Sequence, residues 1–187
     1  MRRERLALII SQILTTRPGR NSLLSIVDKL IQDDRSSANI GVYSNLSSLK
    51  QGLIQKNSND ILRSATPLLG MGDGLTPSGD DLIAGLLLAL NRWSIDGSES
   101  EKLIFLNQGL ILNAYRTTTT LSANLIECAA SGAADEKIIN GLDGIMAGKT
   151  APADIASSFL NWGQHSGTDI LSGIALALVY WLNHDNG

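Results

Sequence analysis

The sequence predicts an all-α fold, a single globular helical domain of about eight or nine helices over residues 1–187. Apolar residues recur at helical spacing along most of the chain, and no stretch alternates apolar and polar residues between turns as a half-buried strand does. Cap and stop residues separate the periodic stretches. A third observation is an internal repeat of two apolar helices, which we expect at the centre of the domain.

The first part of the chain, residues 1–65, is expected to hold N-terminal helices and a polar loop. An amphipathic stripe of five apolar residues predicts the first helix, and Asn21 or Ser22 caps a second; the stripe is Leu6, Ile9, Ile10, Ile13 and Leu14. Residues 33–48 are rich in Ser and Asn, which predicts a mobile loop with a short extended piece at 40–43. Weak apolar periodicity in 49–69 predicts two short helices.

The second part, residues 66–182, carries stronger signals. The spacing of Ser98 and Glu101 is that of a capping box, which opens a helix. Pro152 suits the first turn of another, since its missing N–H is not needed there. The expected helices are Ser78–Trp93, one from the capping box to Tyr115, 123–131 ended by Gly132, 135–147 closed by Gly148, 152–162 ended by Gly163, and a last one from Ser166.

The chain is organised around the segment 70–81, Gly-Met-Gly-Asp-Gly-Leu-Thr-Pro-Ser-Gly-Asp-Asp. Alternate glycines suit a backbone that turns sharply, and Pro77 suits a helix start. Residues 78–93 align without a gap on 166–181, with identity at half of the positions. The repeat predicts two equivalent, central helices, related by a pseudo-twofold and opening toward one shared site. We call the N-terminal ends of these two helices the mouths.

Composition narrows the function. A net charge of −3 and no long basic stretch argue against nucleic acid as a partner. Cys128 is the single cysteine, which excludes an intramolecular disulfide and a cysteine-based zinc site and points to a reducing compartment. The apolar runs are too short to span a membrane. We expect a cytoplasmic protein with no membrane partner.

The acids at the mouths have two interpretations. Asp81 and Asp169 stand three residues after a serine, as in a capping box, and that structural role is as plausible as a functional one. Asp80 has Thr168 as its counterpart in the repeat, so no cap requires it. It is the strongest candidate for a contact with a metal, a proton or a substrate.

Helix N-termini beside a glycine loop can bind a phosphate or carboxylate. The nearby acids would repel such an anion, unless a divalent cation such as Mg²⁺ or cationic side chains intervene. Arg116 is the best-placed cation by sequence, with a solvated helix end as its alternative role. His165 precedes the second mouth and is a candidate for acid–base or anion contact.

Three blocks carry a resemblance to a known family: residues 74–81, Gly-Leu-Thr-Pro-Ser-Gly-Asp-Asp; 120–123, Thr-Leu-Ser-Ala; and 163–169, Gly-Gln-His-Ser-Gly-Thr-Asp. Over about residues 66–182 the chain resembles the AllH-like family. It departs from the family in Gln164, where a glycine is expected before the histidine, and in the length of the chain before the glycine loop. The resemblance implies a subunit of a bacterial oxamate carbamoyltransferase of allantoin catabolism, acting with other protein subunits.

Three hypotheses follow. In the first, the chain is a carbamoyltransferase subunit that binds a small anionic substrate at the paired mouths, and oxamate with carbamoyl phosphate gives oxalurate and phosphate. In the second it is a non-catalytic scaffold subunit, and in the third an Asp-dependent metal hydrolase. The candidate catalytic residues are Asp80, Asp81, His165 and Asp169. The candidate substrate-binding residues are Gly74, Thr76, Ser78, Gly79, Arg116, Thr120, Ser166, Gly167 and Thr168.

Overall fold

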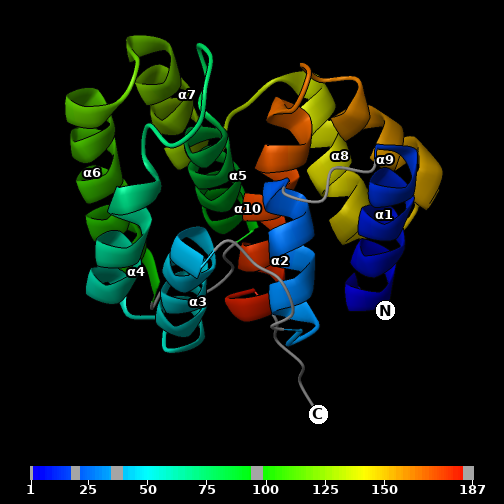
Figure 1. Ribbon diagram of the computed structural model, residues 1–187, viewed down its shortest axis with the longest axis horizontal. Coiled ribbons are helices and arrows are strands. Elements are labelled where there is room, and N and C mark those ends of the chain that lie inside the picture. Colours follow the sequence, from blue (N-terminus) through cyan, green and yellow to red (C-terminus); the bar gives the residue numbers. More distant parts are fainter. Residues whose placement is uncertain (1, 18–21, 35–39, 94–98, 183–187) are drawn as a thin grey trace.

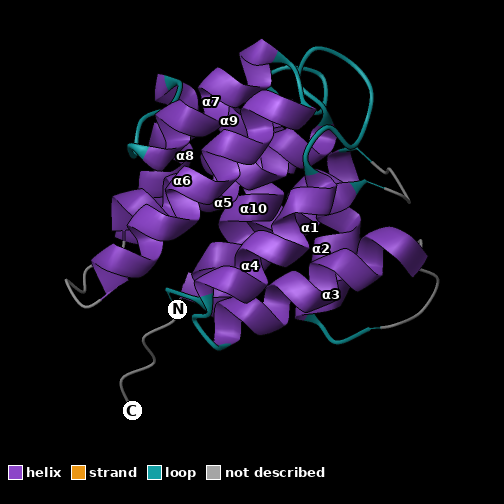
Figure 2. Cartoon of the chain, turned by 90° about the vertical axis from the view of Figure 1, so that its left-hand side faces the viewer, coloured by secondary structure: helices purple, strands orange, loops and turns teal. Residues whose placement is uncertain are grey.

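The computed structural model describes residues 2–17, 22–34, 40–93 and 99–182. Within these ranges the chain forms ten α-helices and one short 3₁₀ helix. Figure 2 shows helices and loops and no strand in this part of the chain. The predicted all-α class is therefore confirmed. The helices are α1 (Arg2–Thr16), α2 (Leu23–Ile31), α3 (Ile40–Ile54), α4 (Ser58–Ala65), η1 (Thr66–Leu68), α5 (Ser78–Trp93), α6 (Ser100–Thr117), α7 (Thr120–Ala130), α8 (Glu136–Ala147), α9 (Pro152–Leu160) and α10 (Ser166–Tyr180).

The two repeated helices, α5 and α10, lie at the centre (Figure 1). Every residue from Gly79 to Leu90 is buried, and so is every residue from Gly167 to Ala177. Helices that are apolar on all sides need neighbours on all sides. In Figure 1, α6 and α7 stand on one side of the pair and α1, α8 and α9 on the other. Apolar side chains from all ten helices join in one core.

Two glycines allow α5 and α10 to touch along their backbones. A Cβ on Gly85 would lie 2.0 Å from the carbonyl oxygen of Ile170, and one on Gly173 would lie 1.9 Å from that of Leu82. Gly85 corresponds to Gly173 in the repeat, and Leu82 corresponds to Ile170. The contacts are thus reciprocal, as a twofold relation between the helices would produce, and they bring both N-termini to the same end of the pair.

The local signals are confirmed at several helix ends. The Ser22 hydroxyl accepts from Ser25 N–H at the start of α2, and the carboxylate of Asp135 accepts from Lys137 N–H at the start of α8. Pro152 is the first residue of α9. Gly148, which ends α8, is left-handed with φ 72°, and Gly163 has φ 66°. Short-range signals of this kind depend on neighbouring residues only, so sequence alone reveals them.

The segment 40–48 is the main correction, since 49–54 was predicted to be helical. We expected a polar loop up to residue 48 with an extended piece at 40–43, but α3 is one helix of 15 residues. Its Leu46, Leu49 and Leu53 are buried at helical spacing, between polar residues that mask the pattern. The described residues form ten α-helices, one more than the upper end of the predicted eight or nine. The rest of that loop, 35–39, and Ser98 of the expected capping box lie outside the described residues.

None of the described helices combines the length and the apolar character needed to cross a membrane.

Candidate functional site

A loop of three left-handed glycines leads into α5. Gly70, Gly72 and Gly74 have φ values of 74°, 113° and 96°, a region that side chains with a Cβ rarely adopt. The loop folds back on the helix start, where Gly79 N–H donates to Met71 O at 2.9 Å. Gly79 itself packs against the Leu68 carbonyl, since a Cβ there would lie 1.9 Å from that oxygen. The loop geometry predicted from the glycines is confirmed.

The connection between α6 and α7 fastens this loop from outside. The Thr119 hydroxyl donates to the Leu75 carbonyl at 2.7 Å, and the Ser122 hydroxyl donates to the same oxygen at 3.4 Å. Thr119 also caps α7 by accepting from Ser122 N–H. The Leu75 side chain is 75% exposed although its backbone is held on two sides. The loop is therefore rigidly placed while it presents a leucine outward.

Asp80 takes part in the same fastening. One of its oxygens accepts from Gly70 N–H at 2.7 Å, and the other accepts a short hydrogen bond from the Thr118 hydroxyl. The carboxylate is buried and joins the glycine loop, α5 and the α6–α7 connection. Its contacts with the protein account for both oxygens, so they already give Asp80 a structural role.

The two mouths meet at a pair of hydroxyl groups. Thr76 Oγ1 lies 3.2 Å from Ser166 Oγ, across 90 residues of sequence. The N–H groups that follow in each helix are already used: those of Gly79 and Gly167 donate to loop carbonyls, and the next two in each helix donate to Pro77 O or His165 O. This leaves the N–H groups of Ser78 and Ser166 as the ones that the first turns offer to a ligand.

The cap interpretation of the mouths is wrong. Both helices begin at the serine itself, Ser78 or Ser166, so these serines are not caps. In α10 the cap position is His165, and its side chain makes no capping hydrogen bond. Asp81 and Asp169 therefore stand one position too deep in their helices to serve as capping-box acids. Helix capping therefore does not explain why two acids are buried at the mouths.

Asp81 is buried in a poorly compensated setting. Its residue is 2% exposed, and its Oδ2 atom has no hydrogen-bond partner. Burial raises the pKa of Asp81 to about 7; the hydroxyls of Ser166 and Thr76 oppose the rise, and the charge of Asp169 adds to it. At neutral pH this carboxyl group is thus close to half protonated.

Asp169 of the second mouth behaves in the same way. It is 3% exposed, and burial raises its pKa to about 6, against the opposing effects of the Ser78 hydroxyl and of His165. Each acid is affected by the serine of the other mouth. The Ser166 hydroxyl of the second mouth lowers the pKa of Asp81 in the first, and the Ser78 hydroxyl of the first lowers the pKa of Asp169 in the second. Two interacting acids with raised pKa values in one place are typical of groups that exchange protons.

The remaining predicted residues differ in how deeply they are buried. Gly74, Arg116, Thr120 and His165 are exposed. Thr168 is buried and its hydroxyl donates to His165 O at 2.7 Å, so it does not repeat the contacts of its counterpart Asp80. Gly167 packs against the Phe159 carbonyl as Gly79 does against that of Leu68. In the described part of the chain, no three His, Cys, Asp or Glu side chains are grouped to hold a metal such as Mg²⁺.

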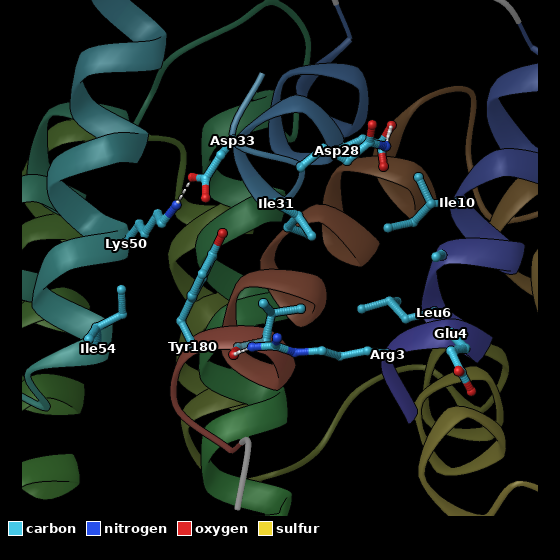
Figure 3. Close-up of a pocket in the computed structure, with 13 residues that line it drawn as sticks. Arg3, Glu4, Leu6, Ile10, Asp28, Ile31, Asp33, Lys50, Ile54 and Tyr180 are labelled. Carbon is cyan, nitrogen blue, oxygen red and sulfur yellow. Dashed lines mark hydrogen bonds and ion pairs between the residues drawn. The ribbon is translucent and has the colours of Figure 1, made fainter. Parts of the chain in front are cut away.

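Sequence analysis did not predict a hollow that lies at the far end of α10 (Figure 3). It has a volume of about 720 Å³ and is lined by α1, α2, α3 and the end of α10. Lys50 points toward Asp33 at 2.6 Å and lies 5.1 Å from the Tyr180 ring, and Arg3 donates to Val179 O at 3.1 Å (Figure 3). It lies about 20 Å from the mouths, the length of α10 at 1.5 Å per residue. Its Lys50 lies on α3.

Comparison with known proteins gives one match. No curated protein and no solved structure matched the chain. The model of the family described as oxamate carbamoyltransferase subunit AllH matches residues 68–178, which is more than half of the chain. The matched region begins at the glycine loop and ends in α10, so it contains both mouths. The chain therefore belongs to the AllH family, the family of the oxamate carbamoyltransferase subunit AllH.

Proposed function

We propose that the chain is a subunit of an oxamate carbamoyltransferase-type enzyme and that the joined mouths of α5 and α10 bind its small anionic substrate. The observation that carries the proposal is the 3.2 Å contact between Thr76 and Ser166. It brings the two motif-bearing segments together, which supports one polar site formed by both mouths. The family match covers both segments, which supports a shared role for them.

The donors at this site suit a carboxylate or phosphate. The Ser78 and Ser166 N–H groups lie at the positive ends of α5 and α10, with three hydroxyls beside them. Arg116 is the exposed cationic candidate, and His165 is an exposed candidate for contact with the anion. The raised pKa values of Asp81 and Asp169 reduce the repulsion that two charged acids would exert on an anion.

The same two acids can serve carbamoyl transfer. When the nitrogen of oxamate attacks the carbamoyl carbon of carbamoyl phosphate, a C–N bond forms, the bond to phosphate breaks and the nitrogen loses a proton. An acid whose pKa lies near neutrality can accept that proton and return it in the reverse reaction. Asp81 or Asp169 would fill this role, and the hydroxyls and N–H groups would hold the reactants in place.

The proposal is tested by phosphate-dependent cleavage of oxalurate to oxamate and carbamoyl phosphate. The rate is measured with the chain alone and with the proteins that co-purify with it from its own host. Asp169→Asn should lower kcat by about a hundredfold while the melting temperature stays within a few degrees. Asp73→Asn, which changes an exposed acid of the glycine loop, is the matched control and should leave kcat unchanged. Equal activity in the two variants would remove Asp169 from the mechanism.

A second candidate, a non-catalytic partner subunit, is favoured by exposed apolar side chains. Leu75 of the glycine loop and Leu121 of α7 are exposed. Further exposed apolar side chains lie along α6: Ile104, Phe105, Leu112 and Tyr115. Single exposed apolar residues are ordinary, but a row along one helix is typical of a contact surface. If Asp169→Asn keeps full activity in the assembled complex while Leu75→Glu disperses the complex, this candidate is preferred.

A further inference from the structure

Helix α6 has an apolar side that faces away from the domain, which we call the outer face. The inner side of α6 packs on the core through four buried residues, Leu103, Leu106, Leu110 and Ala114. The outer face carries four large side chains that are between 46% and 55% exposed, Ile104, Phe105, Leu112 and Tyr115. A helix that is apolar on opposite sides is normally covered on both, as α5 and α10 are. In Figure 1, α6 stands at the left-hand edge of the domain, and no described helix covers its outer face.

The spacing along the outer face indicates that its partner is a helix. The central positions are Phe105, Gln108, Leu112 and Tyr115. The intervals between them are three, four and three residues, which is the period of 3.5 residues that lets two helices pack along a seam. A single polar residue such as Gln108 within a seam helps to fix the register of the two helices. Because α6 has 18 residues, the seam can extend for about 27 Å.

One edge of this seam is basic. Lys102, Gly109 and Arg116 follow one another at intervals of seven residues, so they lie on one side of α6. A Cβ on Gly109 would lie 2.7 Å from the Leu62 side chain, which places this edge beside α4. Lys102 and Arg116 are exposed, and neither forms an ion pair with another residue of the described ranges. The edge therefore favours a partner helix that carries acids opposite these two cations.

A second copy of the chain does not fit this charge pattern. In an antiparallel pair of α6 helices each edge would meet its own equivalent, so Lys102 and Arg116 would face the same cations of the copy. In a parallel pair the basic edge would meet the opposite edge, which carries Ile104 and Ile111 and offers no acid. Both arrangements leave the two cations without a counter-charge. The outer face is thus better matched by a helix of a different sequence.

We propose that the outer face of α6 is a docking site for one amphipathic helix of a partner protein, with apolar residues at heptad spacing and acids on the edge that meets Lys102 and Arg116. The docking site does not rest on the proposed carbamoyl transfer, since the acids and hydroxyls of the mouths take no part in it. Arg116 also belongs to the candidate substrate-binding residues, so the variants below leave it unchanged.

The test uses two labelled helical peptides of about three heptads, with leucine at the seam positions. They are identical except that one carries glutamate on both edges and the other carries lysine. Like charges on both edges also keep each peptide from pairing with itself. The full chain is titrated into each peptide at low salt, and fluorescence anisotropy is followed. The glutamate peptide should bind along a saturable curve, about fivefold more tightly than the lysine peptide.

Variants of the chain locate the contact. Leu112→Glu places a charge in the middle of the seam and should weaken binding of the glutamate peptide by about tenfold or more. Leu8→Glu is the matched control, because Leu8 is also more than half exposed but lies on α1, on the opposite side of the domain in Figure 1. Lys102→Glu should reduce the preference for the glutamate peptide. If Leu112→Glu lowers the melting temperature, Ile104→Ser interrupts the same face with a smaller change.

Four results would overturn the docking site. They are the absence of saturable binding by either peptide, tighter binding of the lysine peptide, undiminished binding to a folded Leu112→Glu chain, and a dimer of the unmodified chain that Leu112→Glu dissociates. Sedimentation of the chain alone detects the last result, which would make a second copy the occupant. Binding of the glutamate peptide by a chain that fails to cleave oxalurate with its partners would keep the docking site and refute the proposed function.

Discussion

The acids at the two ends of the α5–α10 pair have opposite surroundings. We call the C-terminal ends of the two helices the tails. There, Trp93 and Trp181 occupy equivalent positions of the repeat. The indole N–H of Trp93 donates to Asp143 at 3.0 Å, and that of Trp181 donates to Glu99 at 2.8 Å. Each carboxylate also pairs with a cation, Arg92 for the first and Lys56 for the second. At the N-terminal ends, no described cation forms an ion pair with Asp81 or Asp169.

The difference is visible in the pKa values. Arg92 lowers the pKa of Asp143, whereas burial raises the pKa of Asp81 and of Asp169. A carboxylate with a cation and an N–H donor is stabilised in its charged form and is suited to holding helices together. A buried acid without a cation destabilises the fold when it is charged. The acids at the C-terminal ends are thus arranged for stability, whereas those at the mouths weaken the fold when they are charged, as the chemistry proposed for them would require.

The largest expected effect is the pH dependence that this contrast implies. Asp81 titrates near 7 in the folded chain and near 3.8 when unfolded. Its folded state binds the proton more tightly, so its contribution is fully present below the lower value and is lost as pH rises toward 7. The loss amounts to roughly 4 kcal/mol over the full span. Urea unfolding at a series of pH values measures it.

The matched variants separate mouth from tail. Asp81→Asn should flatten the fall in stability between about pH 5 and pH 7, although Asp169 still contributes part of it. Asp143→Asn should keep the fall, because the lowered pKa of Asp143 places its titration below this range. An unchanged slope in Asp81→Asn would mean that the mouths are as well compensated as the tails.

The second effect concerns the backbone contact between α5 and α10. Gly173→Ala would place a methyl group against the Leu82 carbonyl, which is backbone and cannot move aside easily. We expect a loss of about 3 kcal/mol in the free energy of unfolding. Gly109→Ala is the control, since its nearest neighbours are the far atoms of the Leu62 side chain. Equal losses in the two variants would show that the α5–α10 backbone contact is not special.

Much of this fold was predictable because its signals are local. Helix α5 begins and ends where the sequence predicts, at Ser78 and Trp93, since Pro77 precedes it and a long apolar run fills it. The first part of α3, residues 40–48, was missed because Leu46 stands among polar residues whose own preferences indicate a loop, whereas Leu49 and Leu53 lie in a stretch predicted as helix. Only the tertiary burial of Leu46 reveals that the helix begins earlier.

The meeting of the two mouths was predictable from the repeat, but the surroundings of each acid were not. The repeat places Asp80 and Asp81 in one mouth, yet it cannot tell that Asp80 points to Gly70 and Thr118 whereas the Oδ2 atom of Asp81 is buried without a hydrogen-bond partner. Adjacent residues of a helix point in directions about 100° apart, so their surroundings depend on which neighbours pack there. The Thr118 contact comes from the α6–α7 connection, which no spacing in the sequence links to Asp80.

The third effect tests the tail of α10. Glu99→Gln keeps an acceptor for the Trp181 indole but removes the charge that balances Lys56. The Glu99 side chain is 8% exposed, so the loss of the pair should destabilise the fold by about 2 kcal/mol. Glu101→Gln, an exposed acid in the first turn of α6, should change stability by less than about 0.5 kcal/mol. If Glu99→Gln left the stability unchanged, Glu99 would be no better compensated in the folded chain than the acids of the mouths.

The smallest effect belongs to the tail of α5. The Arg92 guanidinium donates to both oxygens of Asp143, at 2.8 and 2.6 Å, but the two side chains are 32% and 34% exposed. Water and salt screen such a pair, so Asp143→Asn should cost about 1 kcal/mol at low salt and less in 0.5 M NaCl, where the Debye length falls to about 4 Å. Because Glu99 is more deeply buried, its variant should show little salt dependence. Urea unfolding of both variants at two salt concentrations measures the difference. If Asp143→Asn proved the more costly and salt-independent change, burial would not be what ranks these pairs, and the contrast between mouths and tails would have to rest on the cations alone.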